Sequence, residues 1–177
     1  MNKLFFLPIV AVLTAALPVR AASNCDAVAA AAMKVFQVPA HLYMTQTAVF
    51  TGGKTRNSES VYLNGAIFVM VGGKWTKSSV SPKDLSDTKK ESDQKLGSCS
   101  VVHDEAVSGE PATLYKVHNQ TPDDTVDTQI WISKLRGLPL KQINDMDVGG
   151  ARGKSHTEIR YEYTNVTAPA VTESRSK

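Results

Sequence analysis

Apolar residues recur at helical spacing near the start of the chain and at strand spacing later. Between residues 24 and 37 they fall three and four positions apart and form one face of a helix, made by Val28, Ala31, Ala32, Val35 and Phe36. Asn24 is a preferred N-cap, and Asp26 suits the positive end of the helix dipole. The pattern stops at Val38-Pro39, because the residue before a proline disfavours helical backbone. A first helix is predicted over residues 24–37, with Asn24 as its cap.

From residue 41 onward the segments are rich in Val, Ile, Thr, Tyr and Phe, and glycine turns such as Gly52-Gly53, Asn64-Gly65 and Gly72-Gly73 separate them. These connections are too short to hold a crossover helix, so neighbouring strands must be antiparallel. The pattern predicts eight strands, over residues 41–50, 58–63, 66–71, 100–107, 112–119, 125–133, 138–146 and 157–166.

The third of these strands is apolar at every position from Ile67 to Val71, which predicts cover on both of its faces. We expect the first helix to supply one cover. A second helix is predicted within residues 81–98, since Ser81 can cap it and Pro82 suits its first turn. It has only Leu85 and Leu96 as large apolar residues, so we expect it to be short and exposed.

The beginning of the chain has the three parts of a secretory signal peptide. Lys3 provides a positive charge, residues 4–17 are almost wholly apolar, and Val19-Arg20-Ala21 has the small residues of a cleavage site. A membrane anchor needs roughly 17–25 apolar residues, and Pro18 interrupts this run earlier. We expect a signal peptide over residues 1–21, a periplasmic or secreted protein that does not span the membrane, one domain over 22–168 and a flexible tail over 169–177.

The charge of the exported chain gives little support to nucleic-acid binding. The full sequence has 20 basic and 17 acidic residues, and cleavage after Ala21 removes two basic residues and no acidic one, which leaves a net charge of +1. Sequence-independent binding to nucleic acid depends on clustered Lys and Arg, and no long basic run remains.

Two cysteines are present, Cys25 and Cys99. In an oxidising compartment two cysteines most simply form one disulfide. A redox pair usually has its cysteines close together, and a metal site needs more ligands. We therefore predict a structural disulfide between Cys25 and Cys99.

A glycine-rich stretch, "DVGGARGKSH" at residues 147–156, partly matches a phosphate-binding loop. Gly153-Lys154-Ser155 matches the end of that motif, but the position that requires its first glycine is Val148. A phosphate-binding loop must also open a helix, whereas residues 157–166 alternate like a strand. We expect a hairpin loop that binds no nucleotide.

No other catalytic or metal-binding group is predicted. A hairpin turn at Gly109 places His103 and His118 diagonally near each other, but no third ligand is identified, and solvent-facing histidines explain the pattern better. The acidic turn at residues 123–127 lacks the spacing of a calcium loop. Glu105, Glu110 and Glu162 are candidate acid–base groups, yet nothing singles out two of them. The prediction is a protein that is not an enzyme and has no cofactor.

Four phrases of the sequence resemble small periplasmic proteins of the lipoprotein-carrier and receptor (LolA/LolB-like) superfamily, chiefly its uncharacterised members. They are "GGKWTKSSVSPKDL" (72–85), "GEPATLYKV" (109–117), "QIWISKLRGLPLKQ" (129–142) and "RYEYTNVTAP" (160–169). The resemblance implies an α+β fold, in which a strongly curved antiparallel sheet of about eight strands forms a half-barrel with both helices packed on its concave side. In the characterised carriers the space between sheet and helices receives lipoprotein acyl chains.

The leading functional hypothesis is a non-enzymatic periplasmic binding or carrier protein for an apolar or amphiphilic ligand, such as a lipid or lipoprotein acyl chain. The candidate cavity residues are Phe68, Met70, Tyr115, Val117, Ile130, Ile132, Tyr161 and Tyr163. Two alternatives remain open. These residues can fill an ordinary core without a cavity, or the protein can present a sheet face or edge to another envelope protein.

Overall fold

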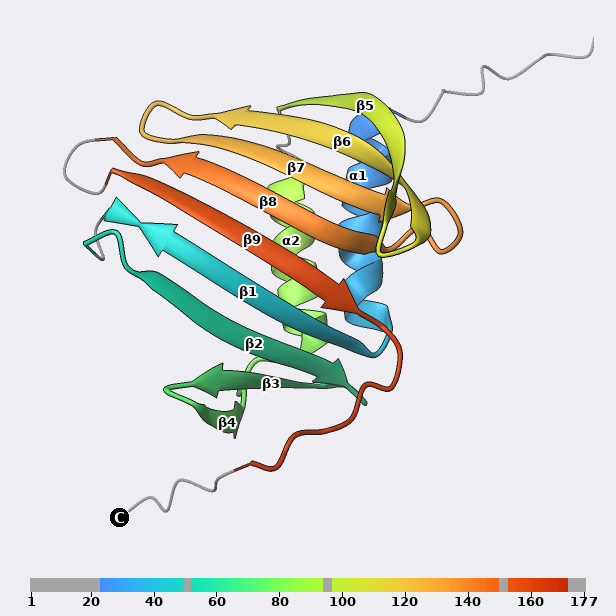
Figure 1. Ribbon diagram of the computed structural model, residues 1–177, viewed down its shortest axis with the longest axis vertical. Coiled ribbons are helices and arrows are strands. Elements are labelled where there is room, and N and C mark those ends of the chain that lie inside the picture. The colour runs from blue at the N-terminus through green and yellow to red at the C-terminus, as the bar shows by residue number, and fades with distance from the viewer. Residues whose placement is uncertain (1–22, 50–51, 94–96, 150–152, 172–177) are drawn as a thin grey trace, which may run out of the picture.

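A computed structural model describes residues 23–49, 52–93, 97–149 and 153–171. The predicted signal peptide therefore lies outside the described residues, as does most of the predicted tail. The chain begins with helix α1 (Asn24–Lys34), which continues as a single 3-10 turn, η1 (Val35–Gln37). Helix α2 (Pro82–Asp93) is the second helix, and Figure 1 shows both helices on the same side of one curved sheet.

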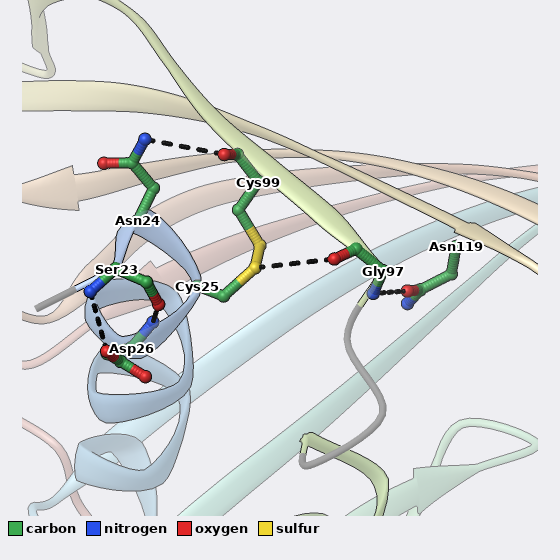
Figure 2. The surroundings of a disulfide bond; sticks show 7 residues. All are labelled: Ser23, Asn24, Cys25, Asp26, Gly97, Cys99 and Asn119. Carbon is green, nitrogen blue, oxygen red and sulfur yellow. Dashed lines mark hydrogen bonds between the residues drawn. A yellow bond between two sulfur atoms is a disulfide. The ribbon is translucent and has the colours of Figure 1, made fainter.

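The cap of α1 is Ser23, so the prediction of Asn24 was wrong by one residue. Ser23 and Asp26 form a capping box, in which the Asp26 amide donates to Ser23 Oγ at 3.1 Å and the Ser23 amide donates to the Asp26 carboxylate at 2.7 Å. Asn24 instead donates its side-chain amide to the Cys99 carbonyl at 3.5 Å (Figure 2). In α2 the Asp84 amide donates to Ser81 Oγ, which agrees with Ser81 as cap, but the helix ends at Asp93.

The sheet has nine strands, one more than the sequence predicts, and all neighbours are antiparallel. The strands are β1 (Ala40–Ala48), β2 (Thr55–Leu63), β3 (Ala66–Val71), β4 (Lys74–Lys77), β5 (Ser98–Val107), β6 (Glu110–Gln120), β7 (Thr125–Ser133), β8 (Pro139–Asp147) and β9 (Lys154–Glu162). The additional strand is β4, which pairs with β3 across Gly72-Gly73.

The spatial order of the strands is β4-β3-β2-β1-β9-β8-β7-β6-β5. Both outer strands, β4 and β5, have a single neighbour among the described residues, so the sheet is open rather than a closed barrel. The predicted α+β half-barrel is therefore confirmed. Every pair except β1–β9 joins strands consecutive in the chain, and β1 connects the two runs of strands by pairing with both β2 and β9.

The register assigns each residue to a face, because directly paired residues on neighbouring strands point to the same side. Tyr62 pairs with Ile67, so Ile67, Val69 and Val71 share the side of Tyr62. Phe68 pairs with Val61 and therefore lies on the opposite side, together with Met70. Cover is incomplete along this strand, since Ile67 is 3% exposed while Val71 is 65% exposed. The prediction of full cover on both faces was wrong at this end, because only the short β4 lies beyond β3.

The core lies on both faces of the sheet. On the concave face Val28 and Ala31 of α1 pack against β6 and β7, in a buried cluster completed by Val117, Ile130 and Ile132. On the convex face a second buried cluster contains Ala112, Leu114, Trp131 and Leu140, with Val107 of β5 packed against it. Trp131 donates its indole N–H to Glu105 of β5. Trp131 is therefore a packing residue of this cluster, with its one polar atom hydrogen-bonded.

The predicted disulfide is confirmed. Cys25 and Cys99 are bonded, with their Cα atoms 5.2 Å apart, and the bond joins the first turn of α1 to the start of β5 (Figure 2). Beside it the Gly97 amide donates to Asn119 Oδ1 on β6. The N-terminal end of α1 is therefore fixed to the β5–β6 edge of the sheet.

The glycine-rich stretch is a hairpin loop between β8 and β9, as expected, and residues 150–152 lie outside the described residues. The Val148 amide donates to the Gly153 carbonyl at 3.1 Å, and Lys154 begins β9. The described part of the chain contains no helix long and apolar enough to cross a membrane.

Candidate functional site

A cavity of about 400 Å³ lies between α1 and the concave face of the sheet. Its size is within the range of small-molecule sites, roughly 300–1,000 Å³. The lining residues come from α1, η1 and six strands and are Val28, Ala32, Val35, Phe36, Leu42, Met44, Tyr62, Val117, Asn119, Thr128, Ile130, Pro139, Gln142, Ile159 and Tyr161. All lining side chains are apolar or uncharged, which is the composition of a site for an apolar molecule.

The cavity exists because the apolar stripe of α1 meets a sheet that curves away from it. Val28 and Ala31 are buried against β6 and β7, while Val35 packs with Ala40 and Leu42 of β1. Between these two contact regions the side chain of Ala32 is small and lines the cavity. The helix therefore touches the sheet at both ends and leaves space beneath its middle.

The structure brings together some of the eight candidate cavity residues and separates others. Val117, Ile130 and Tyr161 line the cavity. Ile132 and Tyr115 belong to the adjoining cluster beneath α1. The remaining three lie elsewhere: Phe68 and Met70 face the convex side, and Tyr163 lies beyond the end of β9 and donates its hydroxyl to the Pro139 carbonyl at 2.6 Å. Whether the three lining residues contact a ligand stays a prediction.

A row of polar side chains crosses the otherwise apolar floor of the cavity. Tyr161 Oη donates to Gln142 Oε1 at 3.0 Å, and Gln142 Nε2 donates to Asn144 Oδ1 at 2.8 Å. Thr128 Oγ1 also donates to Asn144 Oδ1, at 2.9 Å. This network fixes the orientation of the Gln142 amide, which itself lines the cavity.

The environment of the cavity disfavours charge. Burial raises the pKa of the Tyr62 hydroxyl and the pKa of the Tyr161 hydroxyl, and the proximity of Tyr62 adds to the shift of Tyr161. Desolvation disfavours the ionised form of any acid, and it raises the pKa of a tyrosine for that reason. A ligand carboxylate in the same space would meet the same penalty.

Sequence reasoning missed most of the polar floor and the contribution of α1. Gln142, a polar residue within the predicted strand 138–146, is not among the candidate cavity residues. The available signal was a polar residue on the inward side of a strand, because burying an amide requires a partner or a ligand.

The candidate acid–base carboxylates lie outside the cavity and are occupied in other interactions. A hydrogen bond from Trp131 lowers the pKa of Glu105, and hydrogen bonds from arginine side chains lower the pKa of Glu110 and of Glu162. A general acid near neutral pH needs a raised pKa, so these shifts are opposite to what catalysis requires.

The two histidines expected to be neighbours are not. The two-residue turn at residues 108–109 pairs His103 with Leu114, whereas His118 pairs with Ser98 at the far end of the same ladder. The prediction of a diagonal His103–His118 contact was therefore wrong. Among the residues that the structure describes, no group of three or more His, Cys, Asp or Glu side chains is placed to hold a metal ion.

A second hollow, of about 460 Å³, lies where the β1–β2 and β8–β9 hairpins meet. Its lining includes five titratable side chains, Asp127, Asp145, Asp147, Lys154 and His156. Asp145 is hydrogen-bonded to His156, and Asp147 forms an ion pair with Lys154, so these side chains already have partners within the protein. We regard the cavity under α1 as the candidate site, because it lies between helix and sheet and combines an apolar lining with few polar groups.

No family model and no curated protein matches the chain. Several solved structures are similar to it. The Mycobacterium tuberculosis lipoprotein LppX is 10% identical over 81% of this chain and 97% of that chain, with a TM-score of 0.49. The complex of MucA and MucB from Pseudomonas aeruginosa gives 16% identity over 83% of this chain and 58% of the matched chain, with a TM-score of 0.42. A LolA superfamily protein from Nitrosomonas europaea is 9% identical over 80% of this chain and 92% of that chain, with a TM-score of 0.32.

Proposed function

We propose that this protein is a non-enzymatic binding or carrier protein that holds an apolar or amphiphilic ligand, such as a lipid acyl chain, in the cavity between α1 and the sheet. The observation that carries the proposal is a cavity of about 400 Å³ with no charged side chain in its lining. Side chains leave this space between helix and sheet unfilled, whereas an ordinary core would be packed at crystal density.

The energetic argument concerns the apolar lining. Burying apolar surface contributes about 25 cal/mol per Å², or about 0.8 kcal/mol for each methylene group. An acyl chain that fills the cavity would be in contact with Leu42, Ile130 and Ile159 on the sheet side and with Ala32 on the helix side. A chain of several methylene groups gains enough from this burial to offset the loss of its freedom on binding.

The arrangement of α1 suits reversible entry. The disulfide holds the first turn of α1 to β5, whereas the other end, at η1, is held by side-chain packing around Val35 and by the stacking of Phe36 on Tyr62, with ring centroids 5.7 Å apart. Only Val38 and Pro39 join η1 to β1, so this end is tethered too, and entry depends on rotation of the Phe36 and Tyr62 side chains, which both line the cavity.

Native mass spectrometry of the protein isolated from the periplasm of its own cells tests the proposal directly. A carried ligand adds mass that disappears on denaturation. The mass of the denatured polypeptide in the same experiment tests cleavage after Ala21 and hence the proposed periplasmic location. A polypeptide that retains residues 1–21 would contradict the proposed signal peptide.

A cavity-filling variant provides an independent test. Ala32→Phe places a ring in the cavity, and Ala30→Phe is the matched control, since Ala30 is exposed on the same helix. We expect Ala32→Phe to abolish binding of a neutral fluorescent probe such as 1-N-phenylnaphthylamine with little loss of stability, and Ala30→Phe to leave binding intact. In an ordinary core the same change would overpack and cost about 1–3 kcal/mol. A wild-type protein that binds no probe, together with a destabilised Ala32→Phe, would refute the carrier function.

One observation favours the alternative of a protein-interaction module. β5 is an outer strand, and Val101 and Val102 on it are 49% and 42% exposed. Unpaired strand edges with apolar side chains are sites for strand addition by a partner. The substitution Val101→Lys separates the two functions, because it would impair association with an envelope partner and leave probe binding in the cavity unchanged.

A further inference from the structure

The polar groups on the floor of the cavity are unevenly satisfied. The Gln142 amide accepts a hydrogen bond from Tyr161 and uses one N–H to reach Asn144, which leaves its second N–H without an acceptor among the described residues. Asn119 accepts from the Gly97 amide through Oδ1, and the part of the chain that the structure describes offers no acceptor to its Nδ2. Both side chains line the cavity.

Tyr62 adds a third donor of the same kind. Tyr62 lines the cavity, and its hydroxyl has no hydrogen-bond partner within the described ranges, although burial raises its pKa. All three residues are partly exposed to solvent, so a ligand that fills the cavity removes water from three donors and must itself supply acceptors if they are to stay hydrogen-bonded. They lie on β8, β6 and β2, with Gln142 between the other two in the strand order.

The unpaired groups distinguish between ligand classes. A plain hydrocarbon would displace water from the cavity and leave these donors buried without partners, which weakens binding. A carboxylate would accept the hydrogen bonds, but no cationic side chain lines the cavity to balance its charge, and desolvating an unpaired charge is costly. An uncharged carbonyl oxygen accepts hydrogen bonds without either penalty.

We propose that the cavity selects an uncharged amphiphile whose ester or amide carbonyl lies inside it and accepts a hydrogen bond from Gln142 Nε2. The network from Tyr161 and Asn144 positions this amide, and the apolar lining on either side receives the chain. Toward the two ends of the cavity, Asn119 and Tyr62 donate hydrogen bonds to any further acceptor oxygens of the ligand. This inference rests on the proposed function, and it makes Gln142 the residue that determines ligand class.

Three ligands of similar length test the inference by displacing 1-N-phenylnaphthylamine at pH 8: methyl dodecanoate, dodecanoate and tridecane. The carboxylic acid is ionised at this pH. We expect methyl dodecanoate to bind at least about tenfold more tightly than either of the others, because tridecane leaves a donor of the cavity unpaired and dodecanoate carries an uncompensated charge. If dodecanoate or tridecane binds as tightly as the ester, the inference is overturned and the carrier function stands.

Variants assign the preference to its residue. Gln142→Met keeps the length of the side chain and removes both N–H donors. We expect this substitution to weaken binding of the ester by about 3- to 10-fold and to strengthen binding of tridecane. Gln129→Met is the matched control, because Gln129 pairs with Ile143 on the convex face of the sheet. An ester preference that survives Gln142→Met would refute the role of Gln142. If neither the probe nor any of the ligands binds the wild-type protein, the proposed function itself fails.

Discussion

The disulfide between Cys25 and Cys99 gives the largest stability effect expected of a single covalent change in this molecule. The two cysteines are 74 positions apart, so the bond removes the freedom of a long loop from the unfolded chain. For a loop of this length the chain-entropy relation gives about 4.5 kcal/mol at 25 °C. This is an upper value, because residual structure in the unfolded state lowers it.

The native state contributes less to the effect than the unfolded state. After the bond is removed, the capping box at Ser23 and the burial of Val28 and Ala31 still hold α1 on the sheet. We therefore expect the double variant Cys25→Ala/Cys99→Ala to fold, with the same far-ultraviolet circular dichroism and with a free energy of unfolding lower by about 3–4.5 kcal/mol. At 2–4 °C for each kcal/mol, the melting temperature should fall by about 6–18 °C.

Urea denaturation followed by circular dichroism measures the free energy, with the wild type in its oxidised and reduced states as references. The reduced wild type keeps both sulfur atoms and loses the cross-link, so it should match the double variant. A loss of less than about 1 kcal/mol in both would show that the loop-entropy reasoning does not apply here. A reduced wild type that is as stable as the oxidised protein, beside a destabilised double variant, would assign the effect to packing of the sulfur atoms.

Three further predictions concern single side chains. Arg136 binds both carboxylate oxygens of Glu110 and lowers the pKa of Glu110. The pair therefore stabilises the fold above the unfolded-state pKa of about 4.3, and this contribution is lost as the pH falls through the lower folded-state pKa. Glu110→Gln should be less stable than the wild type at pH 7, and urea denaturation at each pH should show the difference shrinking in acid. Ser23→Ala removes the cap of α1 and should cost about 1 kcal/mol in thermal denaturation, and an unchanged midpoint would contradict the assigned capping box. Lys154→Ala should change stability by less than about 0.5 kcal/mol, because this side chain is 79% exposed, and calorimetry with ATP and magnesium should detect no heat with either protein; a micromolar affinity that Lys154→Ala abolishes would contradict the hairpin assignment.

The pattern of the sequence was sufficient for the type and order of most elements. Helix α1 carries a complete apolar stripe, and β7 separates Ile130 and Ile132 from Gln129 and Trp131, so periodicity alone identifies both. β4 was missed because its four residues, Lys74 to Lys77, contain one large apolar side chain and have no measurable period. The turn at Gly72-Gly73 predicts a hairpin and was the signal for a partner strand at this position.

The candidate site was less accessible to sequence reasoning, for a physical reason. A strand in which every residue is apolar, such as β3, carries no alternation, so its inward parity cannot be read and Phe68 and Met70 were placed with the cavity residues. The register with β2 is needed to assign the faces, and it depends on the pairing of Tyr62 with Ile67. The cavity itself depends on how far the sheet curves away from α1, which no local pattern records.

The strand order also has a consequence for how the chain reaches this structure. Strands β1–β4 and β5–β9 form two meanders that are each built from neighbours in sequence, and the pairing of β1 with β9 is the ladder that unites them. His41 and Glu162, which pair in this ladder, are about 120 residues apart. Forming the ladder therefore loses chain entropy before stabilising contacts between the two meanders have formed. The two meanders should therefore acquire protection from hydrogen exchange first, and the β1–β9 amides last. Since the cavity floor extends across this junction, from Leu42 and Met44 on one side to Ile159 and Tyr161 on the other, binding competence should appear only in the final step of folding.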